Sequence, residues 1–153
     1  MNLKNLLTLT IRTVDFNLAA RQPELLEKLR KLTLNPRSGL NCELSRMLND
    51  VKTRRVDCEL LLAYRFRTLV GWGIFSKEDT HFVFPHSMNG FRSEYGRMFQ
   101  VFVNPSHRRQ GIASELFKKA QRLAGDEIIC ICPWDERSTG FYDRFPNVKT
   151  KWL

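Results

Sequence analysis

The residues best suited to chemistry gather in residues 101–114, where an apolar run leads through a short basic turn into a helical pattern. The first turn of a helix carries backbone N–H groups without intrahelical partners and the positive end of the helix dipole, so it favours an anion. Arg108 and Arg109 add positive charge to this turn. Gly111 lets an anion approach the backbone, and Ala113 keeps the next turn small. The segment predicts a phosphate-binding loop, although a basic turn without a ligand uses the same residue types.

A second candidate for chemistry is Tyr142, in the helical pattern of residues 135–145. A neutral tyrosine hydroxyl can donate a proton to a departing anion. By pattern alone, Tyr142 also fits a half-buried aromatic on an amphipathic helix, beside Phe141 and Phe145.

These two segments together resemble the GNAT superfamily of acyl-CoA-dependent N-acyltransferases. The family's motif A is [Arg/Gln]-x-x-Gly-x-[Gly/Ala], and residues 108–113 read Arg-Arg-Gln-Gly-Ile-Ala after a Val-Asn-Pro lead-in. Phe141 and Tyr142 match the apolar-Tyr pair of the family's last helix, in which the tyrosine faces the cofactor sulfur. The resemblance implies an α/β fold: one GNAT domain over residues 1–153, with a mixed central sheet of about six strands flanked by helices and splayed at the fourth strand.

The same resemblance implies acetyl-CoA as co-substrate and Tyr142 as the general acid. The residues that it assigns to the cofactor are Val101, Phe102, Val103, Arg108, Arg109, Gln110, Gly111, Ile112, Ala113, Ser114 and Asp135. Val101 and Val103 would contribute backbone contacts. Asp135 stands where the family usually has asparagine, and Pro146 and Asn147 stand near its usual Gly-Phe. No metal is expected.

Acyl transfer to an amine requires the amine to be neutral. A lysine-like amine with a pKa of about 10.4 needs about 4 kcal/mol to lose its proton near neutral pH, so a base or a water chain must accept that proton. Some family members carry a titratable residue at two positions of the fourth strand. Here these positions hold Phe99 and Arg97, and neither can act as the base. The remaining candidate bases are Glu59, His81, His86 and Glu94. A water-mediated route is therefore expected.

The elements that position these residues follow from periodicity and turn signals. Apolar residues recur at helical spacing between Gly111 and Leu123, and Gly125 predicts the helix end. Strands are predicted at residues 7–14, 58–66, 69–75 and 127–132, and helical stripes at 18–34, 42–51 and 111–124. The family resemblance assigns a further strand to residues 98–103. The tight turn between the second and third strands is expected at Arg67 and Thr68. The long segment 76–97 reads as a loop, with a short extra strand at 81–85.

Composition limits the class of protein. The 153 residues are enough for one domain with its own core, and a hydrophobic content of 42% argues against disorder. The four cysteines, Cys42, Cys58, Cys130 and Cys132, are poorly spaced for a disulfide framework and are expected to be buried thiols. With neither a membrane-spanning run nor a signal-peptide pattern, the expected location is the cytoplasm.

The formal net charge of +9 admits several partners. A solvated arginine-rich surface explains it, and so does an acidic partner such as nucleic acid or the phosphates of the coenzyme. The amine acceptor is expected to be a small molecule, a protein or an aminoacyl-tRNA. The alternative from another class is a non-catalytic module that binds CoA, nucleic acid or protein on the same scaffold. A homodimer is left open.

Overall fold

The computed structural model describes residues 8–33, 58–76, 97–125, 129–131, 141–145 and 148–150. The first helices and strands are β1 (Leu9–Asp15), α2 (Phe16–Ala19), α3 (Pro23–Thr33), β2 (Cys58–Arg65) and β3 (Thr68–Ser76). They are followed by β4 (Arg97–Val103), the short 3-10 helix η1 (Pro105–His107), α5 (Ile112–Ala124), β5 (Ile129–Ile131) and β6 (Val148–Thr150).

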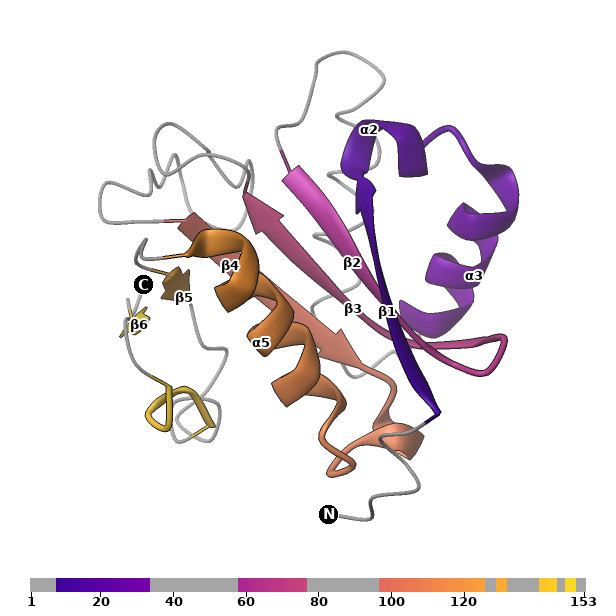
Figure 1. The fold of residues 1–153 in the computed structure, drawn as a ribbon. Coiled ribbons are helices and arrows are strands. Elements are labelled where there is room, and N and C mark those ends of the chain that lie inside the picture. Colours follow the sequence, from indigo (N-terminus) through magenta and orange to yellow (C-terminus); the bar gives the residue numbers. More distant parts are fainter. Residues whose placement is uncertain are drawn as a thin grey trace.

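The described strands lie side by side in chain order, from β1 at one edge to β6 at the other (Figure 1). β1 to β4 pair in antiparallel order, and a tight turn joins β2 to β3, while β4, β5 and β6 pair in parallel. The sheet is therefore mixed, and its change of direction falls at β4. α5 is the helical crossover that follows β4 and leads toward β5.

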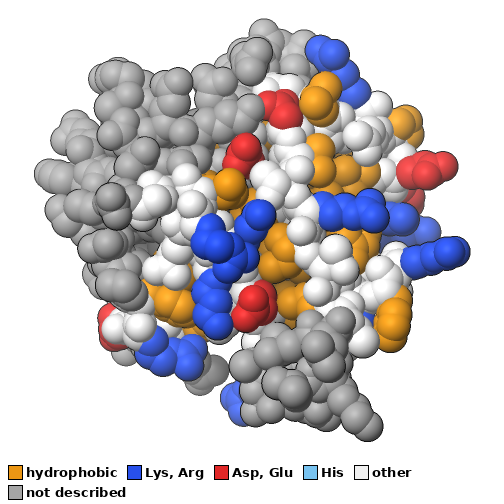
Figure 2. All heavy atoms as spheres, in the orientation of Figure 1, with side chains coloured by type: hydrophobic (Ala, Val, Ile, Leu, Met, Phe, Trp, Pro, Cys, Tyr) orange, Lys and Arg blue, Asp and Glu red, His pale blue; other side chains and the backbone are white. Residues whose placement is uncertain are grey.

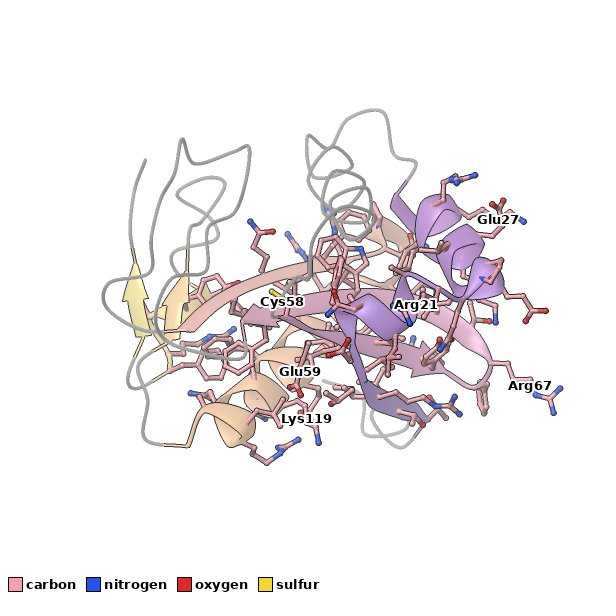
Figure 3. All side chains as sticks on the ribbon, turned by 90° about the horizontal axis from the view of Figure 1, so that it is seen from above. Arg21, Glu27, Cys58, Glu59, Arg67 and Lys119 are labelled. Atoms are coloured by element: carbon pink, nitrogen blue, oxygen red, sulfur yellow. The ribbon has the colours of Figure 1, made fainter. Side chains whose placement is uncertain are left out.

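Each face of the sheet has its own apolar core. α2 and α3 cover one face, where Phe16 and Leu29 pack against Trp72 and Phe102. α5 covers the other face, as Figures 1 and 3 show. The strand side chains divide between the two faces by alternation: in β2, Leu60 and Leu62 lie on the α2/α3 face, whereas Leu61 and Ala63 lie on the α5 face.

Two boundaries differ from the sequence predictions. The helical stripe predicted over residues 18–34 is two helices, α2 and α3, because Pro23 lacks an N–H and disfavours helical geometry at Gln22. The β2–β3 turn lies at Phe66 and Arg67 instead of Arg67 and Thr68, with Phe66 in the left-handed region at φ 55°. In addition, the sequence analysis did not predict β6, because this strand carries no periodicity signal.

Close packing at one glycine brings β3, β4 and α5 together. A side chain at Gly71 would stand 2.9 Å from the carbonyl oxygen of Phe102, 3.4 Å from Val103 and 3.5 Å from Ile112. Only glycine leaves room for this approach. The start of α5 is thereby packed against the end of β4.

The α/β fold inferred from the sequence is confirmed by the sheet with helices on both faces. The strand number of the whole chain and the splay at the fourth strand stay predictions. The helix at 42–51, the loop at 76–97 and the strand at 81–85 lie outside the described residues, as do the ends of the strand predicted at 127–132.

Candidate active site

The backbone of β4 presents polar groups on both of its edges. Asn104, just after the strand, donates its N–H to the carbonyl oxygen of Val70 at 2.9 Å. Because β3 and β4 pair without a register shift, the N–H groups of alternate residues face β3. Phe102 therefore directs its backbone polar groups to β3. Val101 and Val103 direct theirs to the opposite edge, the one that faces β5.

That second edge of β4 is paired only in its first half. β5 pairs with Arg97, Met98 and Phe99, and its described residues end at Ile131. In the part of the chain that the structure describes, no strand pairs with β4 from residue 100 onward on this side. The N–H and C=O groups of Val101 and Val103 thus lie along the part of the edge beyond β5.

The N-terminus of α5 lies just beyond the end of β4. Its capping residue, Gly111, is in the left-handed region at φ 81° and ψ 7°, and no side chain caps the helix within the described residues. The first helical hydrogen bond runs from the N–H of Glu115 to the carbonyl oxygen of Gly111, at 3.0 Å. Residues 111–114 therefore present N–H groups that have no intrahelical partner.

The turn between β4 and α5 is shaped by its own side chains. Asn104 accepts hydrogen bonds from the backbone N–H and the hydroxyl of Ser106, at 3.1 and 2.9 Å, and Pro105 begins the short helix η1. Arg109 is in the left-handed region at φ 61°, a conformation uncommon for a residue with a side chain. Such backbone is maintained only where the surroundings determine it, and it is concentrated at binding sites.

Arg108 is held by the end of β4. Its Nε donates to the carbonyl oxygen of Val103 at 3.0 Å, and its guanidinium carbon lies 5.7 Å from the centre of the Phe102 ring. The guanidinium thereby joins the two residues that end the strand. Phe102 itself is 2% exposed, in the core under α2 and α3, so its side chain lies away from the open edge.

A contact that the sequence patterns did not predict fastens Gln110. Nη1 of Arg65, at the end of β2, donates to the side-chain oxygen of Gln110 and lies 3.4 Å from Nδ1 of His107. These partners are 45 and 42 residues away from Arg65 in sequence. A motif read along the chain cannot reveal such a pair.

The first turn of α5 combines buried and accessible positions. Ile112 is 1% exposed and packs in the core of the α5 face, which anchors the helix start. Ala113 and Ser114 are partly exposed. The helix start is thus packed against the core on one side and partly exposed on the other.

Tyr142 lies in the same core as β4 and α5. Its ring centre is 5.3 Å from that of Phe117 of α5, edge to face, and Phe117 is in turn 5.3 Å from Phe99 of β4. Phe141 and Phe145 also pack on Phe117, at 6.5 and 4.6 Å. Phe117 therefore connects residues 141–145 to the half of β4 that precedes Val101.

Burial decides the protonation state of Tyr142. Its side chain is 7% exposed, and desolvation raises the pKa of the hydroxyl well above its ordinary value of 10.0. A buried phenolate would lose hydration without compensation, so the neutral hydroxyl is the stable form. The hydroxyl of Tyr142 therefore keeps its proton at physiological pH.

This region thus combines an open strand edge, an uncapped glycine-led helix start and a buried tyrosine. A comparison with protein families is independent of these features. The chain matches the acetyltransferase (GNAT) family over residues 25–145, which is most of its length. The chain belongs to the GNAT acetyltransferase family. A comparison with curated proteins gives no match.

Solved structures of N-acetyltransferases share the fold of this GNAT domain. A ribosomal-protein-alanine N-acetyltransferase from Brucella melitensis biovar Abortus 2308 is 19% identical, with a TM-score of 0.55 and 89% of each chain covered. AAC(6')-Iy, an aminoglycoside N-acetyltransferase solved with a CoA-linked bisubstrate analogue, is 19% identical, with a TM-score of 0.59 over 95% of this chain and 94% of that one. AAC(6')-IG from Acinetobacter haemolyticus is 17% identical, with a TM-score of 0.59 and 94% of each chain covered.

The other face of the GNAT sheet holds two buried polar atoms. Oε1 of Gln100 and Nε1 of Trp72 have no hydrogen-bond partner among the described residues, although Gln100 is 4% exposed and Trp72 is fully buried. Both side chains lie on the α2/α3 side, since Gln100 pairs with Ile74 and Trp72 with Phe102 in the β3–β4 register. They are separated by the sheet from Tyr142.

The remaining candidates of the sequence analysis are only partly placed. Glu59 lies on β2 (Figure 3), so β3 stands between it and β4. Asp135 and the candidate bases His81, His86 and Glu94 lie outside the described residues. Among the described residues, no group of three His, Cys, Asp or Glu side chains could hold a metal ion. None of the described helices has the length and apolarity needed to cross a membrane.

Proposed function

We propose that this GNAT domain transfers an acetyl group from acetyl-CoA directly to a primary amine, with Tyr142 as the general acid. The observation that carries the proposal is the uncapped N-terminus of α5 beside the open edge of β4. The start of α5 offers N–H groups to a diphosphate. The edge of β4 offers backbone N–H and C=O groups to a flexible chain that contains amides. Acetyl-CoA has both parts, in that order.

The diphosphate of acetyl-CoA would bind the N–H groups of residues 111–114, where the helix dipole adds to the hydrogen bonds. The pantetheine arm would then pass along β4 from Val103 to Val101, with hydrogen bonds to their outward backbone groups. The strand spans about 13 Å from residue 103 to residue 99 at about 3.3 Å per residue. The thioester would thus come to the end of the open edge, where β5 begins. The inferred splay of the sheet would make room for the arm.

Tyr142 would act where the thioester ends. Supporting this placement, Tyr142 packs through Phe117 toward Phe99, which lies at that same part of β4. The amine attacks the thioester carbonyl, the C–S bond breaks, and the sulfur leaves as a thiolate with a pKa near that of cysteine, about 8.5. The neutral hydroxyl of Tyr142 donates its proton to this thiolate. A backbone N–H on the open edge stabilises the carbonyl oxygen as it gains charge.

The proton released by the amine would leave through water. Glu59 is unsuited to take it directly, because two strand spacings of about 4.8 Å place β2 about 10 Å from β4. Direct proton transfer requires hydrogen-bond distance or one intervening water. His81, His86 and Glu94 remain candidates.

The acceptor class is a primary amine. The structural neighbours named above include an aminoglycoside N-acetyltransferase and a ribosomal-protein-alanine N-acetyltransferase, so the fold accommodates both small and large acceptors. The net charge of +9 keeps an aminoacyl-tRNA acceptor as the second candidate. A non-catalytic CoA-binding or nucleic-acid-binding module would have no chemical need for a buried neutral tyrosine at this place.

A thiol-release assay tests the proposed function. Acetyl-CoA is supplied with separate pools of polyamines, aminoglycosides, peptides and aminoacyl-tRNA, and free CoA is measured with a thiol reagent. Release that depends on one pool, with a mass increase of one acetyl group on the acceptor, is the expected result. Binding of acetyl-CoA without release in any pool would favour the non-catalytic module.

A further inference from the structure

Arg65 reaches from the end of β2 to the turn that precedes α5. Its Nη1 donates to Oε1 of Gln110 and lies 3.4 Å from Nδ1 of His107. Both contacts are partly buried. Because a guanidinium only donates, His107 accepts through Nδ1.

The next two residues of the same hairpin are exposed, whereas Arg65 is partly buried. Phe66 is 77% exposed, and Arg67 is exposed and points away from the sheet in Figure 3. Strand pairing of Arg65 with Leu9 and Thr68 uses the backbone alone. Withdrawing a guanidinium partly from water costs free energy, which its contacts with the turn must offset. The side chain of Arg65 therefore contributes to the turn before α5, through Gln110 and His107.

The turn is held at two points, one on each side of Arg109. Arg108 is bound to the carbonyl oxygen of Val103 in β4, and Gln110 is bound to Arg65 in β2. Between them, Arg109 keeps its left-handed conformation, and Gly111 follows directly after Gln110. The direction of the first α5 amides depends on the backbone at Gln110 and Gly111, so the contact from Arg65 fixes that direction.

We propose that Arg65 is a positioning residue for the diphosphate end of acetyl-CoA. It holds Gln110 so that the amides of residues 111–114 stay aimed at the diphosphate, and it adds a fixed positive charge beside them. This inference rests on the proposed function, because it assumes that CoA binds at this turn. It adds a residue from β2 to a site otherwise formed by β4 and α5.

The test compares Arg65→Met and Arg65→Lys with a control, Arg67→Met, in the same hairpin. Arg65→Met keeps the apolar stem but removes the charge and the donors, whereas Arg65→Lys keeps the charge and a compact ammonium donor but loses the planar guanidinium. Affinity is measured for CoA by calorimetry and for pantetheine, which lacks the diphosphate and the nucleotide, by NMR titration. Thermal unfolding of each variant is recorded alongside.

A charge-assisted contact of about 1.5–3 kcal/mol corresponds to about 10- to 100-fold in affinity. We therefore expect Arg65→Met to bind CoA about 10- to 100-fold more weakly and Arg65→Lys to fall between this variant and the wild type. Pantetheine affinity should stay unchanged in both variants. Arg67→Met should bind both ligands as the wild type does. If Arg65→Met does not fold, the CoA and pantetheine affinities of Arg65→Lys test the proposal.

Three outcomes would overturn the inference. CoA affinity equal to wild type in the Arg65 variants would remove the role of the side chain. Equal weakening toward CoA and pantetheine would mean that Arg65 supports the whole fold and not the diphosphate site. An equal loss of CoA affinity in Arg67→Met would mean that the loss comes from the general surface charge and not from the contacts of Arg65. A wild-type protein that ignores CoA would instead overturn the proposed function, and this inference with it.

Discussion

Tyr142 is the residue on which the proposed chemistry depends most, and replacing it with phenylalanine removes only the hydroxyl. The ring would keep its packing against Phe117, so the core and the affinity for acetyl-CoA should barely change. Loss of a positioned acid should lower kcat by about 10²–10⁴-fold. Steady-state kinetics, together with calorimetry on the same variant, measure the two effects. A Tyr142→Phe enzyme with near wild-type kcat would rule out the assignment.

The raised pKa of Tyr142 has a kinetic consequence. Because burial favours the neutral hydroxyl, the acid keeps its proton at pH values where the acceptor amine begins to lose its own. The value of kcat/KM should therefore rise with pH between about 7 and 9.5 as the amine with a pKa of about 10.4 deprotonates, without a downward limb from Tyr142. A pH profile of kcat/KM measures this directly. An alkaline fall below pH 9.5 that disappears in Tyr142→Phe would contradict it.

Gln100 gives a prediction about stability. Its Oε1 is buried with no hydrogen-bond partner among the described residues, and such an atom costs about 1–3 kcal/mol. Methionine has a similar length and no such requirement, so Gln100→Met should raise the free energy of unfolding by about 1 kcal/mol or more. Urea unfolding of the two proteins measures the difference. A less stable variant would mean that Gln100 makes a contact that stabilises the fold.

At the scale of elements, the two ends of α5 offer a matched pair of glycines. Gly111 is in the left-handed helical region at φ 81° and ψ 7°, where alanine should cost about 1–2 kcal/mol of stability. Gly125, at φ 62° and ψ −119°, is in a region that residues with a side chain rarely adopt, so alanine should destabilise the protein there as well. Only Gly111→Ala changes the amides aimed at the diphosphate. We expect calorimetry to find at least about a tenfold loss of CoA affinity in Gly111→Ala, equivalent to about 1.4 kcal/mol. Gly125→Ala should bind as the wild type does. Equal affinities in the two variants would place the diphosphate elsewhere.

The sequence predicted those elements whose signals are local. The apolar spacing of α5, its flanking glycines and the alternating strands were all readable along the chain, and their boundaries agree within a few residues. Pro23 was equally readable, but the long stripe of leucines concealed the break that it causes. β6 is only three residues long, and its pairing with β5 depends on tertiary contacts.

Contacts across the sheet could not be predicted in the same way. That Val101 and Val103 face the open edge follows from the register with β3, which a single strand does not encode. The bond from Arg65 to Gln110 joins residues 45 apart, and the approach of Phe117 to Tyr142 likewise depends on the folded core. The motif identified the loop, whereas the structure identified the residue that holds it.

For the whole molecule, the net charge of +9 leads to a prediction about salt: the affinity for CoA and the affinity for nucleic acid should depend on salt to different extents. On the face that α5 covers, basic side chains outnumber the acidic ones that lie among them (Figure 2), and Glu115 and Lys118 form an ion pair there at 3.3 Å. CoA affinity rests mainly on fixed amides and should change little with salt. Nucleic-acid affinity should fall steeply, by about 0.7 to 0.9 in log K per log salt for each phosphate contact. Binding titrations at several salt concentrations compare the two slopes, and equal slopes would contradict this division.

The most direct test of the account is an NMR titration of the isotope-labelled protein with CoA, followed at the backbone amides. We predict large shifts at residues 111–114 and at Val101 and Val103, whose N–H groups lie uncapped or on the open edge of β4. The amide of Phe102, directed at β3, should shift much less. No shift at millimolar CoA, or shifts confined to another face of the sheet, would contradict the proposed acetyl-CoA site.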